Sequence, residues 1–227
     1  MKKRLLTPAI ALLAALTVAA PAAAFTLSDV GFEHEPNGVE GQRNRDRDDG
    51  PRETETVDRT LTMPAGGTLR LKTFSGRVKI TGGSGDQLVV HAIRRASRDR
   101  LNDIKLEITV PAKTRLDIKT FSAPVTVTGV NGSQNIDGFS SDVTIESTDL
   151  ADGSDIDVNT FSGDVRLRLP ANARGNIDFN SFSGRFESDL PVTLNTSSRR
   201  NFRGTLNGGG NGAFRLKTFS GDVSIRR

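Results

Sequence analysis

A twelve-residue pattern centred on Phe-Ser recurs six times between Leu69 and Arg227, and it constrains the fold more than any other feature of the sequence. The central phenylalanines are Phe74, Phe121, Phe139, Phe161, Phe182 and Phe219. Their spacings of 47, 18, 22, 21 and 37 residues indicate a unit of about 20 residues. The two long gaps predict degenerate copies near 88–93 and 201–206. The sequence thus predicts an array in which each unit buries its apolar face on its neighbours.

Each unit has the alternation of two β-strands joined by a corner. Leu69 and Leu71 alternate with polar residues before the phenylalanine, and Val78 and Ile80 do so after it. A parallel β-solenoid and an antiparallel β-sandwich both accommodate this pattern. A two-residue hairpin turn needs positive φ at its second position, but two copies carry Ala or Ser there. We therefore expect an all-β fold, a parallel β-solenoid of the β-helix type, with the sandwich as the alternative.

The recurring phenylalanines predict a structural ladder inside the solenoid. Phe74 is out of phase with Leu71 but in phase with Val78, so the chain is expected to turn a corner between Thr73 and Gly76, with the ring pointing inward. Stacked rungs lie about 4.8 Å apart, and truncation of a buried Phe161 to Ala would cost about 3–5 kcal/mol. The alternative is an exposed platform that stacks sugar rings. That role usually falls to Trp or Tyr, and the chain has neither.

The chain begins with the layout of a bacterial secretory signal peptide. A basic head at 2–4 precedes an apolar stretch at 9–20 and a small-residue cleavage site that ends at Ala24. We expect removal of residues 1–24 and a periplasmic or extracellular location. Residues 25–56 are expected to form a disordered charged linker, because 33–59 holds only two large apolar side chains. Residues 57–227 are then the β-solenoid repeat domain.

The composition excludes several classes of protein. The chain has no Cys and only two His, so disulfide scaffolds, thiol nucleophiles and Cys-based zinc sites are excluded. We expect no cofactor and no metal site. The net charge is +4 for the full chain and +1 without the three cations of the leader. So small an excess on an exported protein argues against nucleic acid as a partner.

Two groups of charged residues are candidate sites. The densest basic cluster consists of Arg94, Arg95, Arg98 and Arg100. Guanidinium groups suit phosphate and carboxylate, so an anionic lipid or glycan is the candidate ligand there. Asp142 and Asp164 share the slot three residues after the phenylalanine, where a carboxylate pair can perform acid/base chemistry on polysaccharides. Ordinary surface acids at turns are the alternative, with Asp164 paired to Arg185 on the next rung. His91 has the pattern of a strand histidine.

The last unit ends at Arg227 without a polar capping segment. An uncapped solenoid end exposes backbone hydrogen-bonding groups. We therefore expect an open C-terminal edge that invites strand addition by an envelope protein or by a second copy of the chain.

The best-preserved copies read Thr-Phe-Ser-Gly-Asp-Val at 160–165 and again at 218–223. Tandem units of this kind behind a signal peptide resemble the bacterial "toastrack" domains of unknown function, also labelled putative adhesins. The resemblance covers about 57–227 and rests on repeat rhythm. It implies a β-helical envelope domain with roles in adhesion or stress sensing, and it supplies no active-site residues. We expect an exported, non-enzymatic adhesion, scaffold or sensing module; the alternative is a polysaccharide-acting enzyme on the same scaffold.

Overall fold

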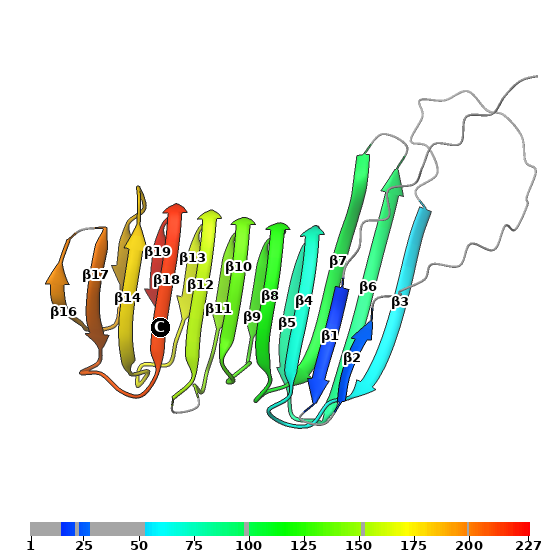
Figure 1. The fold of residues 1–227 in the computed structure, drawn as a ribbon, viewed down its shortest axis with the longest axis horizontal. Helices are drawn as coiled ribbons and strands as arrows, with labels where there is room; N and C mark the ends of the chain where they lie inside the picture. The colour runs from blue at the N-terminus through cyan, green and yellow to red at the C-terminus, as the bar shows by residue number, and fades with distance from the viewer. Residues whose placement is uncertain (1–14, 21–22, 28–52, 98–99, 151–152, 199) are drawn as a thin grey trace, which may run out of the picture.

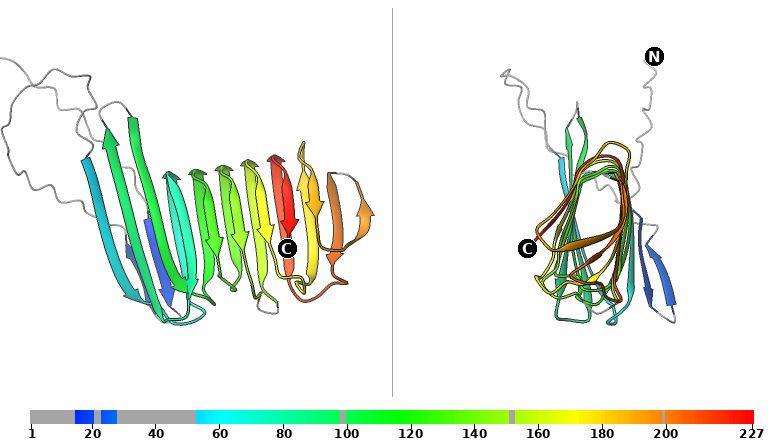
Figure 2. Two further views of the ribbon diagram at one scale, coloured as in Figure 1. Left: turned by 180° about the vertical axis from the view of Figure 1, so that it is seen from behind. Right: turned by 90° about the vertical axis from the view of Figure 1, so that its left-hand side faces the viewer.

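The computed structural model describes residues 15–20, 23–27, 53–97, 100–150, 153–198 and 200–227. These residues form two facing β-sheets and no helix (Figures 1 and 2), so none of them forms a helix able to cross a membrane. In spatial order, sheet A contains β16 (Val192–Ser197), β17 (Asn201–Leu206), β14 (Gly175–Ser181), β18 (Ala213–Ser220), β12 (Asp155–Ser162), β10 (Gln134–Ser140), β8 (Arg115–Ser122), β4 (Thr68–Ser75), β1 (Ala15–Ala20) and β2 (Ala23–Leu27). Sheet B contains β15 (Phe186–Ser188), β19 (Val223–Arg226), β13 (Val165–Arg168), β11 (Val143–Glu146), β9 (Val125–Thr128), β5 (Arg77–Gly83), β7 (Arg100–Pro111), β6 (Gln87–Ser97) and β3 (Glu53–Thr62).

The six Phe-Ser units are the six rungs of a parallel β-solenoid. Each rung places one strand in sheet A and the next strand in sheet B, as β8 and β9 do. Neighbouring rungs pair in parallel with equivalent residues in register, for example Ile136 with Ile118 and Val143 with Val125. The predicted all-β solenoid is therefore confirmed.

The core lies between the two sheets and follows from the period-two alternation of each strand. In β4, Leu69, Leu71 and Thr73 are buried, while the residues between them are exposed. The small residue that precedes each phenylalanine is thus the last inward position of its strand. This column consists of Thr73, Thr120, Gly138, Thr160, Thr218 and Ser181. The inward alternation therefore continues up to the phenylalanine without a break.

Glycine at the corner after Phe-Ser lets the rungs approach closely. A Cβ on Gly221 would lie 2.1 Å from the carbonyl oxygen of Gly163, and one on Gly184 would lie 1.9 Å from that of Gly221. In the third rung the roles are exchanged, because Gly138 replaces the inward threonine and Ser141 replaces the corner glycine. The Ser141 hydroxyl lies 2.8 Å from the Thr120 hydroxyl, so it fills the space and bonds across to the next rung.

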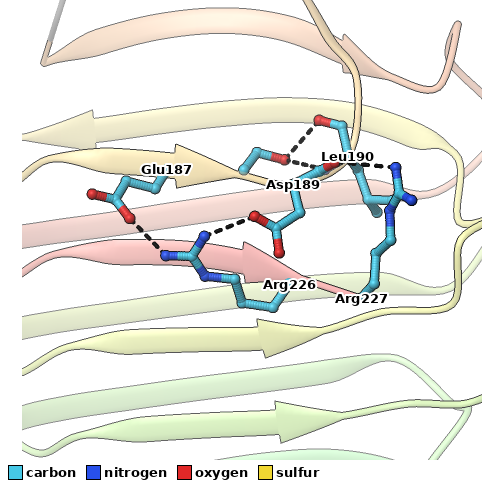
Figure 3. Close-up of polar contacts among 6 residues, drawn as sticks. Glu187, Asp189, Leu190, Arg226 and Arg227 are labelled. Atoms are coloured by element: carbon cyan, nitrogen blue, oxygen red, sulfur yellow. Dashed lines mark hydrogen bonds and ion pairs between the residues drawn. The ribbon is translucent and has the colours of Figure 1, made fainter.

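The rungs do not stack in the order of the sequence. The C-terminal rung, β18 with β19, lies between the β12–β13 rung and the β14–β15 rung. The expected open C-terminal edge is therefore wrong, because β19 pairs with a strand on each side. Arg226 of β19 also forms ion pairs with Glu187 at 2.6 Å and Asp189 at 2.7 Å (Figure 3). The hydrogen bond to Asp189, and to a lesser extent the one to Glu187, raises the pKa of Arg226 above its ordinary value.

Two antiparallel excursions account for the long gaps in the repeat. After the first rung, β6 and β7 form a hairpin that pairs with β5 and β3 and extends sheet B. After the β14–β15 rung, β16 and β17 extend sheet A beyond β14. The predicted degenerate copies near 88–93 and 201–206 are strands, as expected. They are not solenoid rungs, because both run antiparallel to their neighbours.

Strands of the N-terminal region lie against the first rung. Within the predicted signal peptide, β1 pairs antiparallel with β4, and β2 pairs with β1. Residues 1–14 and 21–22 of that segment, and most of the predicted linker, lie outside the described residues. The last residues of the predicted linker belong to β3, which begins at Glu53 and pairs with β6.

Candidate binding surface

The six repeat phenylalanines form one continuous column, but it lies on the outer face of sheet A. Adjacent ring centroids are 4.7–4.9 Å apart, and the ring planes agree within 6°. The column runs Phe74, Phe121, Phe139, Phe161, Phe219 and Phe182. Each ring is 45–64% exposed. The prediction of an inward ladder is therefore wrong, because β4 continues its alternation through Phe74 and the first unit turns only at Gly76, at the end of the predicted corner.

The stack presents ring edges to solvent, and its ring faces are largely covered. Each inner ring is stacked between two neighbours at centroid distances of 4.7–4.9 Å, so its π-faces are occupied. Only Phe74 and Phe182, at the two ends of the column, have one face without a stacked neighbour from this column. A platform for stacked sugar rings needs open faces. The column is instead a narrow apolar ridge, suited to contact with another apolar surface.

Two polar columns run parallel to the phenylalanine column on the same face. The inner column, two residues before each phenylalanine, consists of Lys72, Lys119, Asp137, Asn159, Lys217 and Asn180. The outer column, four residues before it, consists of Arg70, Asp117, Asn135, Asp157, Arg215 and Asp178. A shallow groove of about 560 Å³ lies between the aromatic ridge and the inner column. We call this whole face, ridge and both columns, the ridge face.

The carboxylates proposed as a catalytic pair serve as backbone acceptors at the corner. Asp142 Oδ1 accepts the amide N–H of Asp164 at 2.9 Å, and Asp164 Oδ1 accepts that of Asp222 at 3.0 Å. Asp222 in turn accepts the amide of Arg185 at 2.9 Å. Asp164 therefore does not pair with Arg185, because the inserted rung separates them; its carboxylate pairs with Arg166 at 2.8 Å. The corner aspartates Asp142, Asp164 and Asp222 thus join neighbouring rungs through charge-assisted hydrogen bonds.

We expect Asp164→Ala to lower the free energy of unfolding by about 1–2 kcal/mol, because the amide of Asp222 loses its charged acceptor. Asp164→Asn is the matched variant, since its Oδ1 can still accept that bond, and it should cost less than about 0.5 kcal/mol. Urea unfolding followed by far-UV circular dichroism measures both. Equal losses for the two variants would contradict a hydrogen-bonding role.

The described part of the arginine cluster does not form one cationic patch. Arg94 and Arg95 are consecutive in β6, so their side chains leave opposite faces of the sheet. Arg94 lies 3.9 Å from Glu55, and Arg95 pairs in register with Asp103. Arg98 lies outside the described residues; Arg100 is in β7, and its side chain is not described. Binding of an anionic ligand at these arginines stays a prediction.

The outer surface of the β3–β6–β7 extension carries an ordinary side-chain hydrogen bond and an ion pair. His91 in β6 lies with its Nδ1 2.5 Å from Asp58 of β3, consistent with a strand histidine. On β7, Lys105 lies 3.0 Å from Glu107. That hydrogen bond, together with the charge of Lys105, lowers the pKa of the Glu107 carboxyl.

Comparison with known proteins supplies the family. The family model described as Toastrack DUF4097 matches residues 65–226, which span all six rungs. The chain belongs to the Toastrack family. The crystal structure of a putative cell adhesion protein from Clostridium sporogenes is similar, with a TM-score of 0.57 over 76% of this chain and 99% of that chain. At 10% identity this likeness shows the fold alone. The sequence matches no curated protein.

One signal could have placed the Toastrack ridge correctly from sequence. The residue before each phenylalanine is Thr, Ser or Gly in all six rungs. It continues the inward positions occupied by Leu69 and Leu71, so strict alternation places Phe74 outside. Phe74 and Val78 are an even number of residues apart, which predicted that both point inward. The corner between them shifts the alternation, so Val78 is buried while Phe74 is exposed.

Proposed function

We propose that this Toastrack protein is an exported, non-enzymatic module of the cell envelope that acts in adhesion or as a scaffold. It recognises its partner with the ridge face. The observation that carries the proposal is the exposed phenylalanine column. A run of large aromatic side chains, each about half exposed, is unusual on a soluble domain and is typical of an interaction surface.

The composition of the ridge face supports a role in protein recognition. Interfaces combine aromatic side chains at their centre with a charged and polar rim. Here the rings are flanked on one side by two columns of Lys, Arg, Asp and Asn. All of these side chains stand on paired strands, so the backbone of the surface is preorganised and little backbone conformational entropy is lost on binding.

Export is the second part of the proposal, and the N-terminal sequence supports it. A basic head, an apolar stretch and Ala22–Ala24 form the signal. Cleavage after Ala24 would remove all of β1 and the first residues of β2. The outer edge of β4 would then lose the strand that pairs with it.

The proposal is tested with a Phe139→Ser/Phe161→Ser double variant at the centre of the column. Purified wild-type and variant proteins are incubated with envelope fragments of the producing cells, and the bound fraction is measured over a series of salt concentrations. We expect the double variant to retain less than about a third of the binding, since central aromatic residues dominate interface energies. The same cells, when fractionated, should yield the protein outside the cytoplasm with the mass of residues 25–227.

Leu194→Ser is the matched control for this binding experiment. Leu194 is a large apolar side chain that is also about half exposed, but it lies on β16, away from the column. It should leave envelope binding unchanged. Equal binding by the wild type and the double variant, with folding intact by circular dichroism, would show that the ridge face is not the recognition surface.

A further inference from the structure

We propose that the partner of the ridge face is a second copy of the same chain. Two copies pack ridge to ridge about a twofold axis that lies parallel to the strands. This inference rests on the proposed function and names the partner of the same site.

The ridge is complementary to itself when the rung order is reversed. A twofold axis parallel to the strands keeps each column opposite the same column of the other copy and reverses the order of the rungs. The central rings Phe139 and Phe161 then face each other, and Phe74 faces Phe182. Because both ridges repeat at 4.7–4.9 Å, all six ring edges meet a ring edge of the partner at once.

The outer column has the charge sequence that this symmetry requires. Read along the solenoid it is Arg, Asp, Asn, Asp, Arg, Asp. Reversal places Arg70 opposite Asp178 of the second copy, and Asp117 opposite Arg215. Every full charge except that of Asp157, which faces Asn135, then meets an opposite charge. Each of these contacts occurs twice in the dimer.

The same column also selects the register. A shift by one rung in one direction places Arg70 opposite Arg215. A shift in the other direction places Asp117 opposite Asp178. Like charges directly opposed across an interface are unfavourable and suppress the wrong alignment. The complementary alignment is therefore the one that also brings all six rings together.

The inner column contains the one like-charge opposition, Lys119 with Lys217 of the second copy. Lys119 already forms an ion pair with Asp137 at 3.5 Å, so its charge is partly balanced within its own chain. Asp137 lies on the rung next to Lys119, so in the dimer it is also close to the ammonium group of Lys217 from the second copy. These long side chains border the shallow groove beside the ridge, which gives their ammonium groups room to separate.

The ridge face is large enough for a stable pair. Six strands at about 4.8 Å spacing span about 29 Å, and these strands of seven or eight residues are about 23–26 Å long. A face of this size, in contact over most of its area, buries about 1,200–1,400 Å² summed over both copies. Stable, specific interfaces bury about 1,200–2,000 Å².

A lipid surface fits the same face less well. The two polar columns carry five cations and four carboxylates, so the potential over the ridge is weak. Peripheral membrane binding usually combines apolar contact with a clear excess of basic residues. Alternating positive and negative charges are instead suited to recognition by a protein surface that carries the complementary pattern of charges.

The test is sedimentation velocity of protein produced from its full-length coding sequence, over a range of concentrations at low and moderate salt. We expect a concentration-dependent dimer in the wild type. Phe139→Ser/Phe161→Ser should raise the dimer dissociation constant by at least about tenfold, and Leu194→Ser should leave it unchanged. A wild type that stays monomeric at all concentrations overturns the proposal, and so does a dimer that is indifferent to the double variant.

A charge exchange tests the register and the symmetry. Asp178→Arg should weaken the dimer by about tenfold, because it opposes Arg70 of the second copy. Adding Arg70→Asp in the same chain recreates both intermolecular pairs and should restore the affinity. Within one chain these residues belong to the separate ion pairs with Arg203 and Asp117, so a merely local effect predicts additive losses. Additivity therefore overturns the proposed symmetry.

The failure of this inference is distinguishable from failure of the proposed function. If the chain is monomeric but its binding to envelope fragments still depends on the ridge, the function stands and the second copy is not the partner. If the monomer instead binds vesicles of anionic lipid through the ridge, lipid is the partner and the dimer is wrong. If envelope binding is indifferent to the ridge, the proposed function fails, whatever the oligomeric state.

Discussion

Leu216→Ala is expected to lower the free energy of unfolding by about 2–5 kcal/mol. Leu216 is fully buried in β18, the rung inserted between two others, so removal of its side chain leaves a cavity that neighbours on both sides cannot readily close. Far-UV circular dichroism during urea unfolding is the appropriate measurement, because the chain lacks Trp and Tyr as fluorescent reporters.

Phe161→Ala is the informative comparison for this variant. The ring is large, but it is 47% exposed and its main contacts are the two rings beside it. Loss of partial burial and of stacking should cost only about 1–2 kcal/mol, and not the 3–5 kcal/mol expected for an inward ring. If Phe161→Ala were as damaging as Leu216→Ala, the ridge would be part of the core.

Gly221→Ala is expected to destabilise the protein by about 3 kcal/mol or more. The new Cβ would lie 2.1 Å from the carbonyl oxygen of Gly163 on the adjacent rung. That atom belongs to the backbone, so it cannot move away without disturbing the parallel hydrogen bonds between β12 and β18. Overpacking against flexible side chains costs about 1–3 kcal/mol, and a rigid backbone neighbour should lie at or above the top of that range.

Gly85→Ala is the control for the corner glycine. A Cβ at Gly85 has no neighbour nearer than the Gln87 amide nitrogen at 3.9 Å, and the residue does not adopt a left-handed conformation. The substitution should be neutral or stabilising by up to about 1 kcal/mol, since it restricts the unfolded chain. The same urea titration applies to both variants. A small effect at Gly221 would mean that the rungs are less closely stacked than the structure shows.

The architecture was accessible from sequence because the repeat carries it redundantly. Six copies of one alternating pattern predicted strands, corners and a parallel stack, and the structure and the family match confirm them. The preference for a corner over a hairpin also followed, since a two-residue hairpin turn would not tolerate the Ala and Ser found at its second position. The candidate site was harder to predict. A phenylalanine that recurs in every unit is most simply read as core, and the small polar residues that occupy the inward slot give only a weak signal.

The sequence by itself determined the rungs of this Toastrack solenoid, because period-two alternation and the Phe-Ser-Gly corner act within a dozen residues. The tertiary structure alone decided which face the rings occupy and which rung lies beside which. Alternation specifies two faces but does not say where the corner resets them. All rungs offer equivalent backbone edges, so the excursion through β16 and β17 can return the chain to any open rung. The in-register parallel pairing of β18 with β12 and β14 keeps the exposed rings aligned in one ridge.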